Sequence, residues 1–236
     1  METPVNAPFK EKVRLEFTKL REMTFKGKIE YIWDYYKIHI LCTAISLIAI
    51  FSLLNTWIFN PNPDTVLFIA WNGGYATEEQ LDRLKNHIEE RLIEESANEE
   101  VAIAQFFFSS DDPSMNMAEV QRTVAMIAAG VIDLFITSHQ LLEEQSHIGY
   151  LQPLDQVLAA IKLENPIVYS RIEENIVTAL FETGENIVEQ RPAGINIGNS
   201  PLFSSLGMFR QEIYVGVSVT SGQFNNIVQT LIMLFE

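Results

Sequence analysis

The chain has 236 residues, of which 47% are hydrophobic and 20% charged, a composition typical of folded proteins. The chain has 16 Lys and Arg residues and 31 Asp and Glu residues, which gives a net charge of −15. Nucleic-acid binding requires clustered cations, so this balance excludes nucleic acid as a partner. The single cysteine, Cys42, excludes an internal disulfide and a multi-cysteine zinc site.

Residues 38–59 form an apolar run that is long enough to cross a membrane. The run contains no Asp, Glu, Lys or Arg, and as a helix it reaches about 33 Å, compared with about 30 Å for the hydrocarbon core. Aromatic residues flank it on both sides, as membrane interfaces favour: Tyr31, Trp33, Tyr35 and Tyr36 on one side, Trp57 and Phe59 on the other. We therefore predict a transmembrane helix that contacts lipid through residues 38–59. A signal peptide fits less well, because the run is too long and no small-x-small cleavage site follows it.

The charges on either side of the run predict its orientation. Residues 1–37 carry eight Lys or Arg residues and a local charge of +2, whereas residues 60–236 carry −17. The positive-inside rule assigns the cation-rich side to the cytoplasm. We expect a basic, helical juxtamembrane segment at 1–37 in the cytoplasm, a linker at 60–64, and an extracellular domain at 65–236, in a single-pass protein of the cell membrane.

The predicted extracellular domain alternates strand-like and helix-like segments. Strand patterns occupy 65–71, 101–108 and 131–136, and helix patterns occupy 77–95, a stretch from Asp112 or Asn116 to Gly130, and a stretch that begins at Thr137. Thr77 with Gln80, and Thr137 with Gln140, have the spacing of helix capping boxes. Farther on, 154–161, 166–181 and 224–235 are helix-like, and 191–197 and 213–219 are strand-like. This order predicts an α/β fold, one three-layer lobe with a mainly parallel sheet.

Two segments carry a resemblance to a known family. Residues 128–136 read AAGVIDLFI and residues 149–155 read GYLQPLD. They resemble the extracellular solute-binding proteins of bacterial ABC importers, in which a helix, an Ala-Gly-x-x-Asp-like turn and a strand precede a Gly-x-Leu-x-Pro-Leu-Asp-type segment. Residues 194–202 and 214–217 resemble returning strands of such a lobe. The resemblance implies a periplasmic-binding-protein-like lobe, and the layout with residues 28–37 before one span is similar to small membrane-anchored proteins of Gram-positive bacteria.

The ends of the first three predicted strands supply the candidate ligand site. In open α/β sheets, ligands bind beyond the carboxyl ends of the strands. The candidate ligand-binding residues at these ends provide an aromatic ring, hydroxyls, a carboxylate and an imidazole: Trp71, Asn72, Gly73, Ser109, Ser110, Asp111, Ser138 and His139. The alternative is that these residues only shape the local backbone, because Gly73 suits a turn and Ser110 and Ser138 suit helix caps.

The sequence contains no recognisable catalytic or metal-binding motif. His87, His139 and His147 lack the spacing of metal ligands, and no nucleophile, nucleotide or protease motif occurs. We therefore expect no metal, no cofactor and no catalytic residue. The expected function is that of a non-catalytic, ligand-sensing or accessory binding module. The alternative is a degenerate lobe that docks another membrane or envelope protein through an exposed apolar patch, and a homodimer of two lobes would rebuild a two-lobed cleft.

Overall fold

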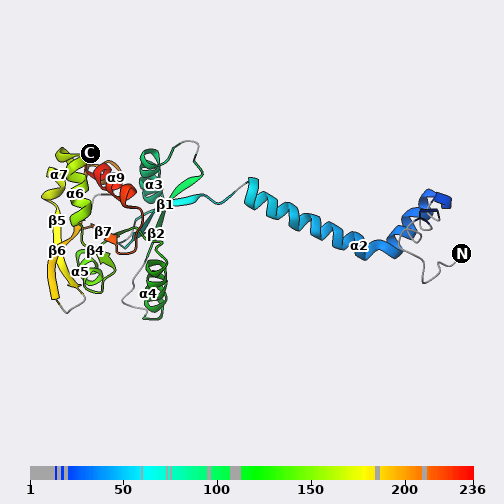
Figure 1. The fold of residues 1–236 in the computed structure, drawn as a ribbon, viewed down its shortest axis with the longest axis horizontal. Coiled ribbons are helices and arrows are strands. Elements are labelled where there is room, and N and C mark those ends of the chain that lie inside the picture. The colour runs from blue at the N-terminus through cyan, green and yellow to red at the C-terminus, as the bar shows by residue number, and fades with distance from the viewer. Residues whose placement is uncertain are drawn as a thin grey trace. The chain divides into compact units, whose positions relative to one another are not determined.

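The computed structural model of the chain describes residues 14, 17–18, 21–59, 61–72, 74, 76–94, 97–106, 113–183, 187–208 and 212–236. The chain divides into two compact units, residues 1–62 and residues 63–236. Figure 1 shows the elements of both units.

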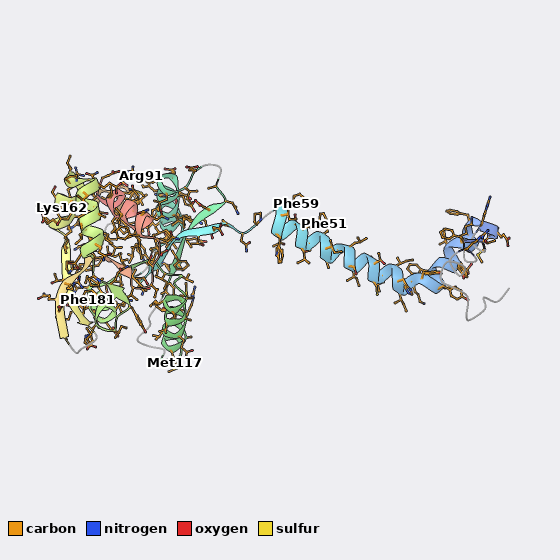
Figure 2. All side chains as sticks on the ribbon, in the orientation of Figure 1. Phe51, Phe59, Arg91, Met117, Lys162 and Phe181 are labelled. Carbon is orange, nitrogen blue, oxygen red and sulfur yellow. The ribbon has the colours of Figure 1, made fainter. Side chains whose placement is uncertain are left out.

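The N-terminal unit contains one long helix. Helix α2 covers Phe25–Leu54 and begins at the N-cap Thr24, whose side chain accepts a hydrogen bond from the Gly27 amide, and the π-helical turn η1, Asn55–Phe59, continues it. Its segment Trp33–Phe59 is long and apolar enough to cross a membrane, and none of that segment is buried within the protein. Figure 2 shows its side chains, Phe51 and Phe59 among them, projecting outward from the helix. The lack of burial excludes a core helix, which leaves a membrane span or a signal sequence.

The second unit is built on a seven-stranded sheet. Its strands are β1 Asp64–Trp71, β2 Glu99–Gln105, β3 Leu134–Thr137, β4 Leu151–Gln152, β5 Ile176–Thr183, β6 Ile187–Asn196 and β7 Tyr214–Ser218. The order is β2-β1-β3-β7-β6-β5, and β4 pairs with β7 beside that path. Strand β1 is parallel to both β2 and β3, whereas every pair involving β5, β6 or β7 is antiparallel. The sheet is therefore mixed, and the prediction of a mainly parallel sheet holds only for the first three strands.

Helices cover both faces of the sheet, which confirms the predicted three layers. They are α3 Glu78–Leu92, α4 Pro113–Ala128, α5 His139–His147, α6 Asp155–Glu164, α7 Pro166–Glu173, α8 Pro201–Ser205 and α9 Phe224–Phe235. Side chains of β1 alternate between two apolar clusters: Leu67 and Ile69 pack in one with α3, α6, α7, α8 and α9, and Ala70 packs in the other with α4 and α5. Figure 1 shows α3, α6 and α9 on one side of the sheet and α4 and α5 on the other.

Local sequence signals explain most helix starts. The predicted capping box is present at α3, where the Thr77 hydroxyl accepts from the Gln80 amide at 3.3 Å and the Gln80 side chain accepts from the Thr77 amide at 3.1 Å. Helix α4 begins at Pro113, which agrees with the predicted start at Asp112 and not with the one at Asn116. The capping box predicted at Thr137 is wrong, because Thr137 is the last residue of β3 and Ser138 caps α5 instead.

The predicted helix at 166–181 is correct only in its first half. Helix α7 ends at Glu173, and Ile176–Thr183 form β5, which pairs along its whole length with β6. The β-branched and aromatic residues of this stretch suit a strand, and its pairing partner lies beyond the local window that suggested a helix.

Asp133, immediately before β3, ties three parts of the domain together. Its carboxylate accepts hydrogen bonds from the Phe68 amide of β1 at 2.8 Å and from the Ser221 hydroxyl, which lies between β7 and α9. Its main chain bonds the carbonyl of Phe68 and the amide of Ser218. Asp133 is buried, and burial raises the pKa of its carboxyl above the ordinary 3.8, although the hydrogen bonds from Ser221 and Phe68 act in the opposite direction.

We predict that Asp133→Asn removes a pH dependence from the stability of the domain. Because the folded-state pKa is raised, this group stabilises the fold fully below about pH 3.8 and loses that contribution as the pH rises through the folded pKa. The asparagine amide can donate to Ser221 and accept from Phe68, so both contacts survive. In urea denaturation at a series of pH values, the variant should gain stability relative to the wild type as the pH rises. A constant difference across the series would contradict the prediction.

Candidate functional site

The connections of the first three strands create a switch point at β1. The chain passes from β1 through α3 to β2 on one side, and then through α4 to β3 on the other side. Where successive crossovers diverge in this way, the loops beyond the carboxyl ends of the strands separate and leave room for a ligand. The candidate site lies at these ends of β1 and β3.

Three polar side chains lie next to one another across this edge. The main-chain N–H of Asn72 donates to the carbonyl of Ile136 at 2.6 Å, which places Asn72 beside Thr137. Thr137 lies directly opposite Tyr214 in the antiparallel pair of β3 and β7. Side chains alternate along a strand, and Ala70 belongs to the α4 and α5 face, so Asn72 points to that face too. We call Asn72, Thr137 and Tyr214 the polar row.

The polar row contains buried polar groups that have no hydrogen-bond partner within the described part of the chain. Asn72 is 8% exposed and Thr137 is fully buried. Both carboxamide atoms of Asn72 and the hydroxyl of Thr137 lack a hydrogen-bond partner among the described residues. A buried polar group without a partner costs about 1–3 kcal/mol, and native proteins contain few of them. Two such side chains in adjacent strands are therefore suited to bind a molecule that supplies the missing donors and acceptors.

Tyr214 adds a phenol to the row. Its ring is buried, and the ring of His139 packs edge-on against it with centroids 5.2 Å apart. Burial raises the pKa of Tyr214 above its ordinary value, and the Glu212 carboxylate shifts it in the same direction. The phenol is therefore protonated at neutral pH and can donate a hydrogen bond. The row as a whole offers a carboxamide, a hydroxyl and a phenol, all of them uncharged.

A charged pair from α4 lies beside the row. The Phe106 amide, directly after β2, donates to the carbonyl of Trp71 at 3.0 Å. The guanidinium of Arg122 lies 4.8 Å from the centre of the Phe106 ring and 3.9 Å from the carboxylate of Glu119. One oxygen of that carboxylate is buried without a hydrogen bond among the described residues. That oxygen is the one that faces Arg122, so α4 brings an ion pair to this side of the sheet.

The predicted site residues have different environments. Trp71 is buried on the opposite face, stacks on Phe203 with ring centroids 6.0 Å apart, and donates its indole N–H to the carbonyl of Gly74 at 2.7 Å. Ser138 caps α5, and its hydroxyl accepts from the Leu141 amide. His139 begins α5 with its Nδ1 3.8 Å from Glu143. The other predicted residues lie outside the described residues: Gly73, Ser109, Ser110 and Asp111.

The structure thus brings Asn72 and His139 together at one edge and assigns Trp71 and Ser138 to packing and capping. Sequence reasoning missed Thr137 and Tyr214 as site residues. Thr137 carried a usable signal, because it is a polar residue that directly follows an apolar strand. Tyr214 carried none, because its position depends on the antiparallel pairing of β7 with β3.

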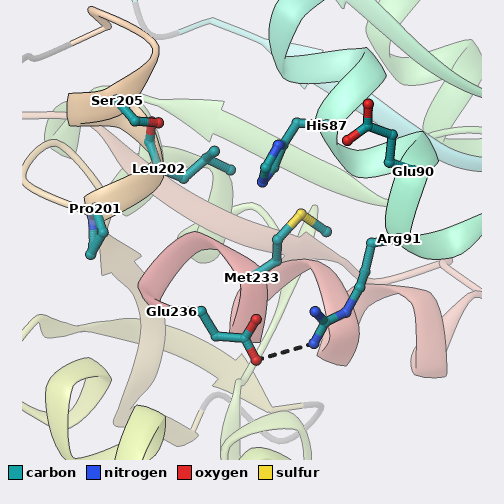
Figure 3. A pocket seen from close by; sticks show the side chains of 8 residues that line it. All are labelled: His87, Glu90, Arg91, Pro201, Leu202, Ser205, Met233 and Glu236. Carbon is teal, nitrogen blue, oxygen red and sulfur yellow. Dashed lines mark hydrogen bonds and ion pairs between the residues drawn. The ribbon is translucent and has the colours of Figure 1, made fainter.

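Three cavities lie away from the polar row. A cavity of about 310 Å³ between α4 and α5 is lined by Val120, Leu141 and Ile148, and by Gln145, whose buried carbonyl oxygen lacks a partner among the described residues. A second, of about 550 Å³, lies between α5 and strands β5 and β6. Figure 3 shows a third, of about 540 Å³, whose lining includes Arg91 and Glu236, an ion pair at 3.1 Å, together with His87 and Glu90.

Comparisons with known proteins leave the family open. No protein-family model matches the chain, and no curated protein matches it. A solved structure that it resembles is a TRAP periplasmic solute-binding protein from Ochrobactrum anthropi. The sequences are 8% identical, the match covers 73% of this chain and 75% of that chain, and the TM-score is 0.28. A TM-score this low does not establish a shared fold.

We predict that Thr137→Val stabilises the ligand-free protein. The substitution replaces a buried hydroxyl that has no partner in the described part of the chain with a methyl group of similar size, so it removes a desolvation penalty of about 1–3 kcal/mol. Thr230→Val is the matched control, because Thr230 is equally buried but its hydroxyl donates to the Asn226 carbonyl at 2.7 Å. Chemical denaturation should show a gain for Thr137→Val and a loss for the control. Equal losses in both variants would mean that the Thr137 hydroxyl is satisfied in the native protein.

Proposed function

We propose that the chain is a single-pass membrane protein whose α/β domain, at residues 63–236, binds a small, uncharged, polar molecule outside the cell. The observation that carries the ligand part is the pair of buried side chains Asn72 and Thr137 at a topological switch point, whose polar atoms have no hydrogen-bond partner among the residues that the structure describes. A binding pocket orients its ligand with a small number of such polar groups in an otherwise apolar setting.

The chemistry of the row favours a neutral ligand. Asn72 can donate and accept, Thr137 can do both, and the protonated phenol of Tyr214 can donate. Residues 60–236 carry a net charge of −17, so the surroundings disfavour an anion, and the pair of Glu119 with Arg122 beside the row adds no net charge. A sugar, a nucleoside or a carboxamide provides the complementary donors and acceptors.

The membrane part of the proposal is supported by α2 and its flanks. The helix exposes apolar side chains throughout its segment Trp33–Phe59, and a bilayer would cover them. The eight cations of residues 1–37 favour a cytoplasmic N-terminus. The same arrangement makes the domain a receptor or accessory binding module fixed at the cell surface, in keeping with the resemblance of residues 128–136 and 149–155 to solute-binding proteins.

We propose a binding role and not a catalytic one. The hydroxyl of Ser138 accepts from a backbone amide at the start of α5, a capping role, and His139 is engaged with Tyr214 and Glu143. Within the described residues, no group of three or more His, Cys, Asp or Glu side chains could hold a metal ion. The groups of the polar row bind and orient but include neither a nucleophile paired with a base nor a metal ligand set.

A docking function is the second candidate, and the surface between α4 and α5 favours it. Val120 and Ile148 are 46% and 51% exposed and line the cavity of about 310 Å³, and Met117 and Val124 extend the apolar surface along α4. An apolar surface next to a groove is typical of protein–protein contacts. This surface is separate from the polar row, so substitutions can test the two functions independently.

We predict that a neutral polar ligand raises the unfolding temperature of the full chain in detergent. A panel of sugars, nucleosides and carboxamides should contain a compound that stabilises the protein, by about 2.7 kcal/mol at 100 times its dissociation constant. Thr137→Val should abolish the shift, because it removes a hydrogen bond to the ligand. Val124→Ser, on the α4 surface, is the control and should leave the shift unchanged. Loss of the shift in the control alone would favour the α4 surface as the binding site.

We predict that protease added to intact cells digests residues 63–236 and spares the N-terminal segment. The cations of residues 1–37 keep that segment in the cytoplasm, whereas the domain is exposed outside. Immunoblotting with tags at the two ends of the chain provides the measurement, and lysed cells provide the control. Protection of the C-terminal tag in intact cells would reverse the orientation.

A further inference from the structure

One face of α2 changes its chemical character where the apolar run begins. Positions spaced alternately by four and three residues follow a heptad pattern along the helix. In chain order they are Phe25, Ile29, Ile32, Tyr36, His39, Thr43, Ser46, Ile50 and Leu53. We call this set the α2 seam. Its first four members are apolar or aromatic, and its next three are polar.

The first part of the seam is apolar in the segment that precedes the apolar run of residues 38–59. Phe25 is 80% exposed and Ile29 is 56% exposed on the described helix. Of the nine positions off the seam in residues 26–37, five carry charges, Lys26, Lys28, Glu30, Asp34 and Lys37, and three are aromatic, Tyr31, Trp33 and Tyr35. A helix with an apolar seam and charged flanks is typical of helices that associate in water.

The second part of the seam is polar in a segment that lipid would surround. From residue 38 to residue 49, six positions away from the seam carry large aliphatic side chains: Ile38, Ile40, Leu41, Ile45, Leu47 and Ile48. The seam carries His39, Thr43 and Ser46, with Cys42 and Ala49 at its border. Small and hydroxyl-bearing residues gather where membrane helices pack, because they allow close approach and hydrogen bonds between helices.

The two halves together indicate contact with another helix. Lipid is a favourable environment for the aliphatic face of the apolar run but not for His39. Water is a favourable environment for the charged residues before the run but not for Phe25. A helix that runs alongside the seam on both sides of the membrane boundary suits both halves. The required partner is apolar in its aqueous part and polar or small in its lipid part, which is the pattern of the seam itself.

We infer that two copies of this chain pair in parallel along the α2 seam. The inference rests on the proposed membrane span, because all copies then insert in one orientation and equivalent seam residues meet at one depth. In the heptad frame Lys28 occupies position g and faces position e of the second copy, which is Trp33. An ammonium group beside an indole ring is an attractive cation–π arrangement. The pair brings two ligand-binding domains to one anchor.

Cysteine crosslinking of the full chain in native membranes tests this pairing. Cys42→Ser removes the single cysteine, so each added cysteine reports one position. Thr43→Cys and Ile29→Cys lie on the seam in the lipid and aqueous halves. Leu41→Cys and Asp34→Cys are their matched controls on the opposite side of the helix. Disulfides require Cβ atoms about 3.5–4.5 Å apart, so the seam variants should give several-fold more covalent dimer under oxidation than the controls, on non-reducing gels.

The outcomes separate the inference from the proposed function. Equal crosslinking at seam and control positions, or none at any position, in chain that stays in the membrane after carbonate washing would overturn the pairing and leave the anchor intact. Release of the chain by carbonate would instead overturn the proposed membrane span. Strong crosslinking at Leu41→Cys without Thr43→Cys would assign the contact to a different face of α2 and also overturn the inference.

Discussion

The parallel pairing of β1 with two neighbours, β2 and β3, is the constraint on which the rest of the domain depends. Parallel neighbours must be joined by crossover connections. The chain makes one crossover through α3 on one face of the sheet and the next through α4 on the other face. The parallel pairing also brings the ends of β1 and β3 to one edge, where their last polar residues become neighbours. At the opposite end of β3, Asp133 fixes the pairing through Phe68 and couples it to the segment between β7 and α9. The antiparallel strands then extend this framework and bring Tyr214 beside Thr137.

The same framework explains why Asn72 and Thr137 are buried yet have no side-chain hydrogen bond within the described residues. The main-chain groups of β1, β3 and β7 bond one another at this edge, so they are not available to the side chains of Asn72 and Thr137. Helices α4 and α5 cover the face and exclude water without supplying partners among the described residues. The fold therefore keeps the polar side chains of Asn72 and Thr137 buried at a cost in stability. Such a cost is common at functional sites and uncommon elsewhere. Binding of a complementary molecule would convert that penalty into affinity.

Local sequence patterns predicted the parts of the fold that local chemistry controls. The capping box at Thr77, the start at Pro113, the first three strands and the closing helix at 224–235 all follow from short-range signals. The strand at Ile176–Thr183 did not follow, because its pairing with β6 involves residues outside the window that suggested a helix. The site was predictable to the same extent. Asn72 was found because it follows a strand, whereas Tyr214 required the antiparallel register. The core position of the Trp71 ring follows from strand alternation, which the position of Trp71 at the end of a strand did not show.

The most direct test of the central claim is nuclear magnetic resonance of the Asn72 side-chain amide during titration with the neutral polar panel. If the polar row binds the ligand, the two Asn72 amide protons shift and become protected from exchange, and methyl signals of Val120 and Val124 on α4 stay in place. If the methyl signals shift while the Asn72 amide does not, the ligand binds between α4 and α5, and the account of the polar row is wrong.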